Sequence, residues 1–150
     1  MPCNTAHAFA GAIVAASDLP FIDLIEATAD EAVAHQASRV GVLAADGCLQ
    51  AGLYQHALAR RHVEPVLLGP RAQARFMGLL HAIKAGDRGR QVRTGMQALA
   101  DELVSAGAGS LVAGCTEVPL VLGPDDVAVP LTDSIDALAR ATIAASEKRP

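Results

Sequence analysis

Short apolar segments alternate with longer amphipathic segments along the whole chain, and this alternation constrains the fold more than any other feature. The predicted strands are residues 20–26, 39–44, 63–68, 110–115 and 127–131. The predicted helices are residues 28–37, 49–61, 71–85, 89–106 and 134–147. Strands that alternate with helices form βα units. The sequence therefore predicts an α/β fold with mainly parallel sheets and flanking helices.

Local signals place several of these elements more closely. Pro65 removes a backbone donor from the strand at 63–68, so we expect that strand at a sheet edge. Apolar residues at positions 76, 79, 80 and 83 lie on one face of a helix. Gly86 is typical of a helix end, and Asp133 or Ser134 is expected to cap the last helix.

The overall composition excludes several classes of partner. The net charge is −4 with no dense basic stretch, which argues against nucleic acid because phosphate binding relies on clustered Lys and Arg. No apolar run approaches the roughly 20 residues needed to span a bilayer, and the first residues do not resemble a signal peptide. The three cysteines are an odd, widely spaced set, which favours reduced thiols in a cytoplasmic protein over a disulfide framework.

The three cysteines fall on one predicted edge of the sheet. In open α/β sheets, ligands bind outside the carboxyl ends of the strands. Cys115 ends a predicted strand, Cys48 follows the end of another, and Cys3 opens the loop before the first helix. We therefore expect the functional site where these thiols lie.

Two motifs at opposite ends of the chain have the same pattern, a cysteine followed by polar side chains. In PCNTAH (residues 2–7), a thiol just before a helix is favoured as thiolate, and the next side chains offer donors to a carboxylate. GCTE (residues 114–117) repeats the pattern at the end of a strand. Taken singly, each thiol is as readily a buried inert cysteine, and Cys3 with His7 could form an incomplete metal pair. Taken together, two thiols facing one carbon could remove a proton from one face and return one to the other, provided that one starts as thiolate and one as thiol.

The ordered set of motifs resembles the aspartate/glutamate racemase family. PCNTAH resembles the family's first catalytic motif and GCTE its second. Residues 40–55 and 69–87 resemble the middle segments, and PLTDS at 130–134 resembles the final strand-to-helix turn. The resemblance implies an amino-acid racemase that uses no pyridoxal phosphate, other cofactor or metal, with two cysteines on opposite faces of the α-carbon.

The resemblance also implies roles for particular residues. Cys3 and Cys115 would alternate as catalytic base and acid. A glutamate after the second Cys-Thr resembles members that act on aspartate, so the implied substrate is a dicarboxylic amino acid, with aspartate preferred. Family members often carry threonine at position 48, where this chain has a weaker thiol donor. The residues implied to bind substrate are Asn4, Thr5, Thr116, Glu117 and Cys48.

The resemblance further implies a two-lobed, dimeric enzyme. The family's opening strand and Gly-rich turn have no counterpart before Cys3. We therefore expect residues 23–108 to form a central α/β lobe, and residues 1–22 with 109–150 to form an incomplete second lobe that carries the two catalytic cysteines. Two alternatives stay open: another two-thiol enzyme of the superfamily, such as a maleate isomerase or hydantoin racemase, or a catalytically silent truncated fragment.

Four further polar side chains have an open role. His7 lies one helical turn from Cys3, where it would tune the Cys3 pKa, contact substrate or serve the structure. Tyr54 is expected to pack with its hydroxyl at the edge of the core. Asp23 and Glu26 are interpreted as loop or capping groups.

Overall fold

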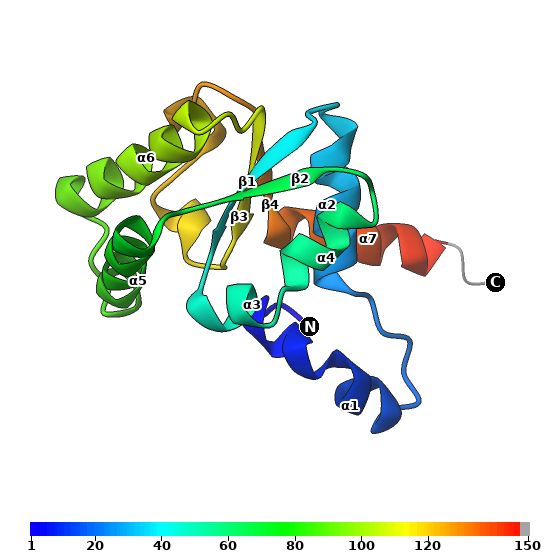
Figure 1. Cartoon of the computed structure of the whole chain (residues 1–150). Helices are drawn as coiled ribbons and strands as arrows, with labels where there is room; N and C mark the ends of the chain where they lie inside the picture. The colour runs from blue at the N-terminus through cyan, green and yellow to red at the C-terminus, as the bar shows by residue number, and fades with distance from the viewer. Residues whose placement is uncertain (148–150) are drawn as a thin grey trace.

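A computed structural model, which describes residues 1–147, shows a four-stranded parallel sheet between two layers of helices (Figure 1). The strands run in the order β2-β1-β3-β4, and every neighbouring pair is parallel. Their bounds are Arg39–Ala44 (β1), Glu64–Leu67 (β2), Ser110–Gly114 (β3) and Leu131–Asp133 (β4). The predicted α/β class with a parallel sheet is confirmed.

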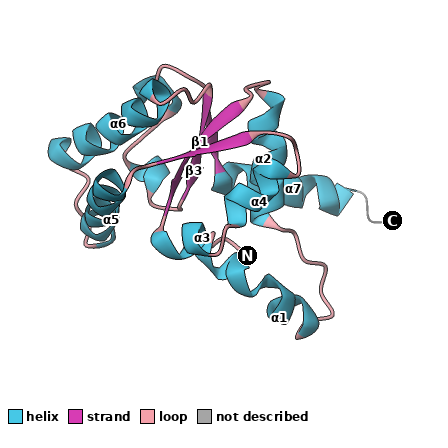
Figure 2. Cartoon of the chain, viewed as in Figure 1, coloured by secondary structure: helices cyan, strands magenta, loops and turns pink. Residues whose placement is uncertain are grey.

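The helices divide between the two faces of this sheet (Figure 2). Helices α5 and α6 cover one face, while α2, α4 and α7 cover the other. The short helices α1 and α3 lie beyond the sheet, near the N-terminus (Figure 2). The α-helices are Ala10–Ala15 (α1), Leu24–Ala34 (α2), Asp46–Gln50 (α3), Leu53–Ala59 (α4), Pro70–Lys84 (α5), Arg90–Ser105 (α6) and Ser134–Glu147 (α7), and the 3₁₀ helices are Thr5–Phe9 (η1), Val118–Leu120 (η2) and Pro124–Asp126 (η3).

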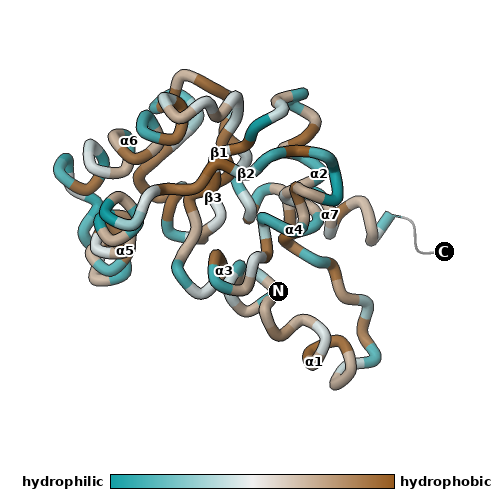
Figure 3. The backbone as a smooth tube through the Cα atoms, viewed as in Figure 1, coloured by the Kyte–Doolittle hydropathy of each residue, from teal (hydrophilic) through white to brown (hydrophobic). Residues whose placement is uncertain are grey.

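The strand side chains alternate between two apolar cores. Val42 and Val112 join the core under α2 and α4, whereas Leu43 and Leu111 join the core under α5 and α6. Successive side chains of a strand point to opposite faces, so a strand buried on both sides reads as a continuous apolar run. The tube coloured by hydropathy shows this concentration of apolar residues along the central strands (Figure 3).

Strands from both predicted lobes join the same sheet. β1 and β2 come from residues 23–108, and β3 and β4 come from residues 109–150. β1 and β3 pair from Val40 with Ser110 through to Ala44 with Gly114. The predicted boundary near residue 108 therefore does not separate two sheets, because the two most buried strands meet across it. The segment that lies outside the sheet is the N-terminal one, containing η1 and α1 (Figure 1).

The first predicted strand is wrong. Residues 20–23 form no regular structure, and α2 begins at Leu24. The Asp23 carboxylate accepts hydrogen bonds from the backbone N–H groups of Ile25 at 2.8 Å and Glu26 at 3.1 Å. This N-cap decides the local structure over the short apolar run. The prediction that Asp23 is a capping group is confirmed.

Several other elements differ from their predicted bounds, and the helix predicted at residues 28–37 is Leu24–Ala34. The final strand is Leu131–Asp133 rather than residues 127–131. The predicted helix at 49–61 is divided in two because Gly52 has φ +67°, the left-handed conformation that ends α3 and starts α4. The edge position of β2, the helix end at Gly86 and the capping of α7 by Asp133, which accepts from the Ile135 N–H at 2.8 Å, are confirmed.

Within residues 1–147, none of the helices combines the length and the apolar character needed to cross a membrane.

Candidate active site

Chain segments that are distant in sequence meet at the carboxyl ends of the strands. Cys48 lies on α3, just beyond the end of β1, and Cys115 directly follows β3. The N-terminal motif packs against α3 so closely that a Cβ on Gly47 would lie 2.9 Å from the Thr5 methyl carbon. The Cys3 and Cys115 motifs therefore lie at the same edge of the sheet, beyond the carboxyl ends of the strands.

Tyr54 connects the two cysteine motifs. Its hydroxyl donates to Asn4 Oδ1 at 2.5 Å, and Asn4 follows Cys3 directly. Its ring lies against Gly114, where an added Cβ would be 2.7 Å from Tyr54 Cε2, and Gly114 precedes Cys115 directly. The Tyr54 side chain is fully buried, so the prediction that its hydroxyl lies at the edge of the core is wrong. A buried phenol requires a polar partner, and here that partner comes from the site.

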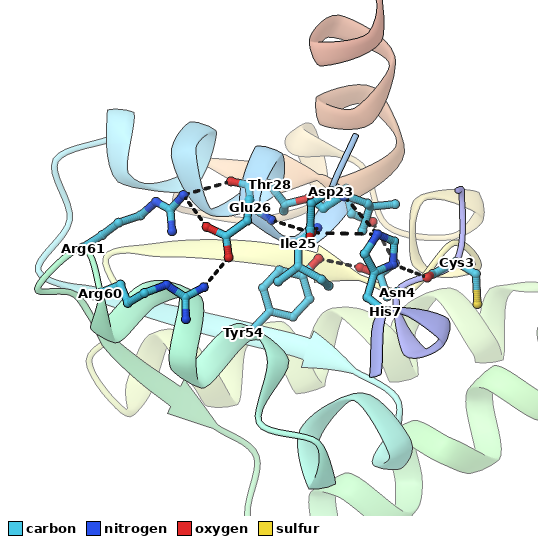
Figure 4. A network of polar contacts seen from close by, with 12 residues as sticks. Cys3, Asn4, His7, Asp23, Ile25, Glu26, Thr28, Tyr54, Arg60 and Arg61 are labelled. Carbon is cyan, nitrogen blue, oxygen red and sulfur yellow. Dashed lines mark hydrogen bonds and ion pairs between the residues drawn. The ribbon is translucent and has the colours of Figure 1, made fainter. Parts of the chain in front are cut away.

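The loop that carries Cys3 is held by His7. The buried His7 ring accepts from the Leu24 N–H at Nε2 (3.1 Å), so the proton on Nδ1 is available to donate to the Cys3 carbonyl at 2.8 Å. These two bonds tie the backbone of Cys3 to the start of α2. The Cys3 side chain is exposed, and its sulfur points away from this polar network (Figure 4). His7 thus contacts the Cys3 backbone rather than the thiol.

Cys115 lies beside a carboxylate. Its Sγ donates to Glu117 Oε2 at 2.9 Å, and Thr116 Oγ1 donates to the same oxygen at 3.0 Å. Lys84 Nζ, on the last turn of α5, lies 4.0 Å from Glu117 Oε1. The thiol, the carboxylate and the ammonium thus form one polar group at the end of β3. Lys84 was not among the predicted site residues, because only the packing of α5 against the sheet brings it there.

The electrostatics of this group keep Cys115 protonated. Burial, and then the neighbouring Glu117 carboxylate, raise the pKa of the Cys115 thiol from its ordinary value of 9.0 to about 12. Burial acts to raise the pKa of Glu117 as well, but the hydrogen bonds from Cys115 and Thr116 outweigh it, and the Glu117 pKa falls below its ordinary value. At neutral pH, Cys115 is therefore a thiol hydrogen-bonded to an ionised carboxylate.

Cys48 occupies a different environment from the other two cysteines. Its side chain is fully buried in the core that also contains Tyr54 and the inner residues of α2. Burial, with a smaller contribution from the nearby Cys3, raises the pKa of the Cys48 thiol to about 12. The structure therefore places Cys48 behind the candidate site as a neutral thiol. Among residues 1–147, no group of three or more His, Cys, Asp and Glu side chains is arranged to hold a metal ion.

The two buried thiols predict a loss of stability at alkaline pH. Below about pH 9 the folded and unfolded chains both keep these protons, so the contribution is fully present. Between about pH 9 and 12 the unfolded chain releases protons that the folded chain retains, and the free energy of unfolding falls. We expect the urea midpoint to decline from about pH 9 upward, and less steeply in a Cys48→Ala variant. A midpoint that does not change up to about pH 10 would argue against two buried protonated thiols.

The family model for Asp/Glu/hydantoin racemase matches residues 1–142. The chain therefore belongs to the Asp/Glu/hydantoin racemase family.

Among individual relatives, the chain is similar to the broad-specificity amino-acid racemase RacX of Bacillus subtilis, with 29% identity over 95% of this chain and 62% of that protein. It is also similar to the glutamate racemase of Pseudomonas paraeruginosa, with 32% identity over 86% of this chain and 51% of that protein. The structure of Picrophilus torridus aspartate racemase matches with a TM-score of 0.85 and 25% identity, over 99% of this chain and 62% of that one. The chain thus spans about three fifths of the length of RacX and of the Picrophilus enzyme.

Proposed function

We propose that this chain racemises a dicarboxylic amino acid, with aspartate preferred, by proton transfer between Cys3 and Cys115. The observation that carries this proposal is the contact between the Cys115 thiol and the Glu117 carboxylate, at the edge of the sheet that also holds the exposed Cys3. A two-base racemase needs one protonated and one unprotonated group at the start of each turnover. The buried Cys115 thiol beside an anion supplies the protonated one.

The proposed step conserves protons and electrons. The Cys3 thiolate removes the α-proton from one face, and the electron pair of the broken C–H bond stays on the α-carbon. The Cys115 S–H then delivers its proton to the opposite face, leaving Cys3 as thiol and Cys115 as thiolate. The reverse sequence converts the other enantiomer, as general acid–base catalysis requires.

The charge that develops on the α-carbon passes to the substrate carboxylate, which needs positioned donors. We assign this role to the hydroxyls of Thr5 and Thr116 and to the backbone N–H groups that follow each cysteine. The Thr116 hydroxyl already donates within the site, to Glu117. Asn4 contributes through its side-chain amide, whose orientation is fixed by its neighbours.

The preference for aspartate rests on two observations. Lys84 brings a positive charge next to Glu117 and Cys115, where it can meet the second carboxylate of a dicarboxylic substrate. The fold also matches an aspartate racemase at a TM-score of 0.85. We also propose a cytoplasmic location, freedom from cofactors, homodimer formation, and an incomplete second lobe of residues 1–22 and 109–150 that carries the two cysteines.

A substrate series tests this proposal. The purified chain is incubated with L-aspartate, D-aspartate, L-glutamate, L-alanine, a chiral hydantoin and maleate. Chiral chromatography separates the enantiomers, and reversed-phase chromatography separates maleate from fumarate. We expect both aspartate enantiomers to racemise, and L-aspartate to react faster than L-glutamate and L-alanine. Faster conversion of maleate or a hydantoin than of any amino acid would instead assign the chain to another activity of the superfamily, and no conversion at all would support a silent fragment.

A further inference from the structure

Three buried side chains from distant parts of the sequence form a continuous polar chain beneath the candidate site. Tyr54 of α4 donates to Asn4 Oδ1 at 2.5 Å, and Asn4 Nδ2 donates to Ser134 Oγ at 3.1 Å. Tyr54 and Ser134 are fully buried, and Asn4 is 3% exposed. Figure 4 shows the Tyr54 hydroxyl directed at Asn4, next to Cys3. Buried polar networks of this kind stabilise one arrangement when every member has a partner.

The two hydrogen bonds hold the Asn4 amide with its oxygen toward Tyr54 of α4 and its nitrogen toward Ser134 of α7. The Tyr54 hydroxyl donates its proton to the amide oxygen, and this oxygen faces α4. Ser134, the first residue of α7, takes one of the two N–H groups. In the proposed reaction, the second N–H of Asn4 would donate to the substrate carboxylate. With the opposite orientation, Asn4 would present its oxygen instead.

The helix that carries Tyr54 is linked to the neighbouring helix α2. The ion pair between Arg61, in the turn that follows α4, and Glu26 of α2, at 2.9 Å, ties the end of the helix that carries Tyr54 to its neighbour (Figure 4). The Tyr54 ring is confined by Gly114, which leaves no space for a Cβ. Closely packed groups transmit displacements rather than absorb them. Tyr54 therefore couples the residue after Cys3 to the residue before Cys115.

We propose that Tyr54 and Ser134 are positioning residues, which orient the Asn4 amide and thereby hold the Cys3 loop in register with Cys115. This inference rests on the proposed racemase function for its catalytic consequence, but its structural part is independent of catalysis. Neither residue contacts the reacting atoms, because both are buried and act through Asn4. The sequence pattern assigned Tyr54 to packing and Ser134 to helix capping.

The test uses Tyr54→Phe, which removes the hydroxyl and keeps the ring that packs on Gly114. The rate of alkylation of each cysteine by iodoacetamide is followed by mass spectrometry in the unmodified chain, Tyr54→Phe, Asn4→Ala and the double variant. We expect Tyr54→Phe to raise the Cys3 rate roughly two- to tenfold, the range expected for one lost hydrogen bond. The double variant should react no faster than Asn4→Ala, because Tyr54 acts through Asn4. Cys48 and Cys115 should stay unreactive, which shows that the core is intact.

A Cys3 rate that does not change in Tyr54→Phe, or two substitution effects that multiply in the double variant, would overturn the inference. Should Tyr54→Phe expose Cys48 through unfolding, Ser134→Ala replaces it in the same cycle, since it removes the other partner of Asn4.

Racemisation kinetics form the second arm of the test. We expect kcat to fall by about tenfold or more in Tyr54→Phe with little change in KM, because a displaced catalytic loop impairs the reaction more than binding. A change in KM with kcat unaltered would overturn the positioning role. The two substitutions could show non-additive effects on the Cys3 alkylation rate in a protein that racemises no substrate. That result would support the positioning of the Cys3 loop and refute the proposed function.

Discussion

Cys115→Ala is expected to reduce racemisation of aspartate by roughly 10²- to 10⁴-fold, the usual contribution of a positioned general acid or base. In the structure Cys115 is the protonated thiol, hydrogen-bonded to Glu117 at 2.9 Å, that would return a proton to the α-carbon. The side chain is small and lies at the end of β3, so its loss leaves the sheet intact. The rate is measured by chiral chromatography from each enantiomer separately.

Ser110→Ala is the matched control for this variant. Ser110 lies at the opposite end of β3, is fully buried, and its hydroxyl has no hydrogen-bond partner among residues 1–147. Removing that oxygen deletes one side-chain atom, as Cys115→Ala does, but at the start of β3 rather than beyond its end, where the candidate site lies. We expect Ser110→Ala to racemise aspartate at the rate of the unmodified chain. Equal rates for Cys115→Ala and Ser110→Ala would contradict a catalytic role for Cys115.

Phe76→Ala is expected to lower the free energy of unfolding by about 3–5 kcal/mol. Phe76 is 0% exposed on α5 and belongs to the core between α5, α6 and the sheet. Truncation removes the buried ring and leaves a cavity that the surrounding helices fill only in part. Domains of this size are stable by about 5–15 kcal/mol in total, so the variant should unfold at a much lower urea concentration.

Phe9→Ala makes the same chemical change on the surface. Phe9 is 69% exposed at the end of η1, so its substitution should change the free energy of unfolding by no more than about 0.5 kcal/mol. Urea denaturation followed by circular dichroism gives both values under the same conditions. Similar losses in the two variants would show that α5 does not pack on the sheet as described.

The parts of the fold that were predicted correctly have strong local signals. The buried strands at 39–44 and 110–115 are continuous apolar runs, and the long helices at 71–85 and 89–106 have one apolar face each. The strand predicted at residues 20–26 is wrong because an aspartate within this apolar run caps a helix. Periodicity alone does not detect such a cap. The last strand has only three residues, too short for its pattern to separate it from the preceding loop.

The candidate site divides in the same way. Both cysteine motifs, with their threonines, were predicted because each is contiguous in sequence and resembles a family motif. The partners of Asn4 were not, because they lie 50 and 130 residues away along the chain. Likewise Lys84 reaches Glu117 only through the packing of α5 beside the end of β3. Sequence order also does not reveal that β1 pairs with β3 across residue 108, because parallel pairing joins strands that are distant along the chain.

Exchange of the α-proton in D₂O, followed by NMR with L- and D-aspartate, is the most direct test of the proposal that Cys3 and Cys115 act on opposite faces of one carbon. The unmodified chain should incorporate deuterium at the α-carbon of both enantiomers, and Cys3→Ala and Cys115→Ala should each slow this exchange. The absence of exchange above the rate without protein, or exchange that neither substitution slows, would contradict the two-thiol mechanism.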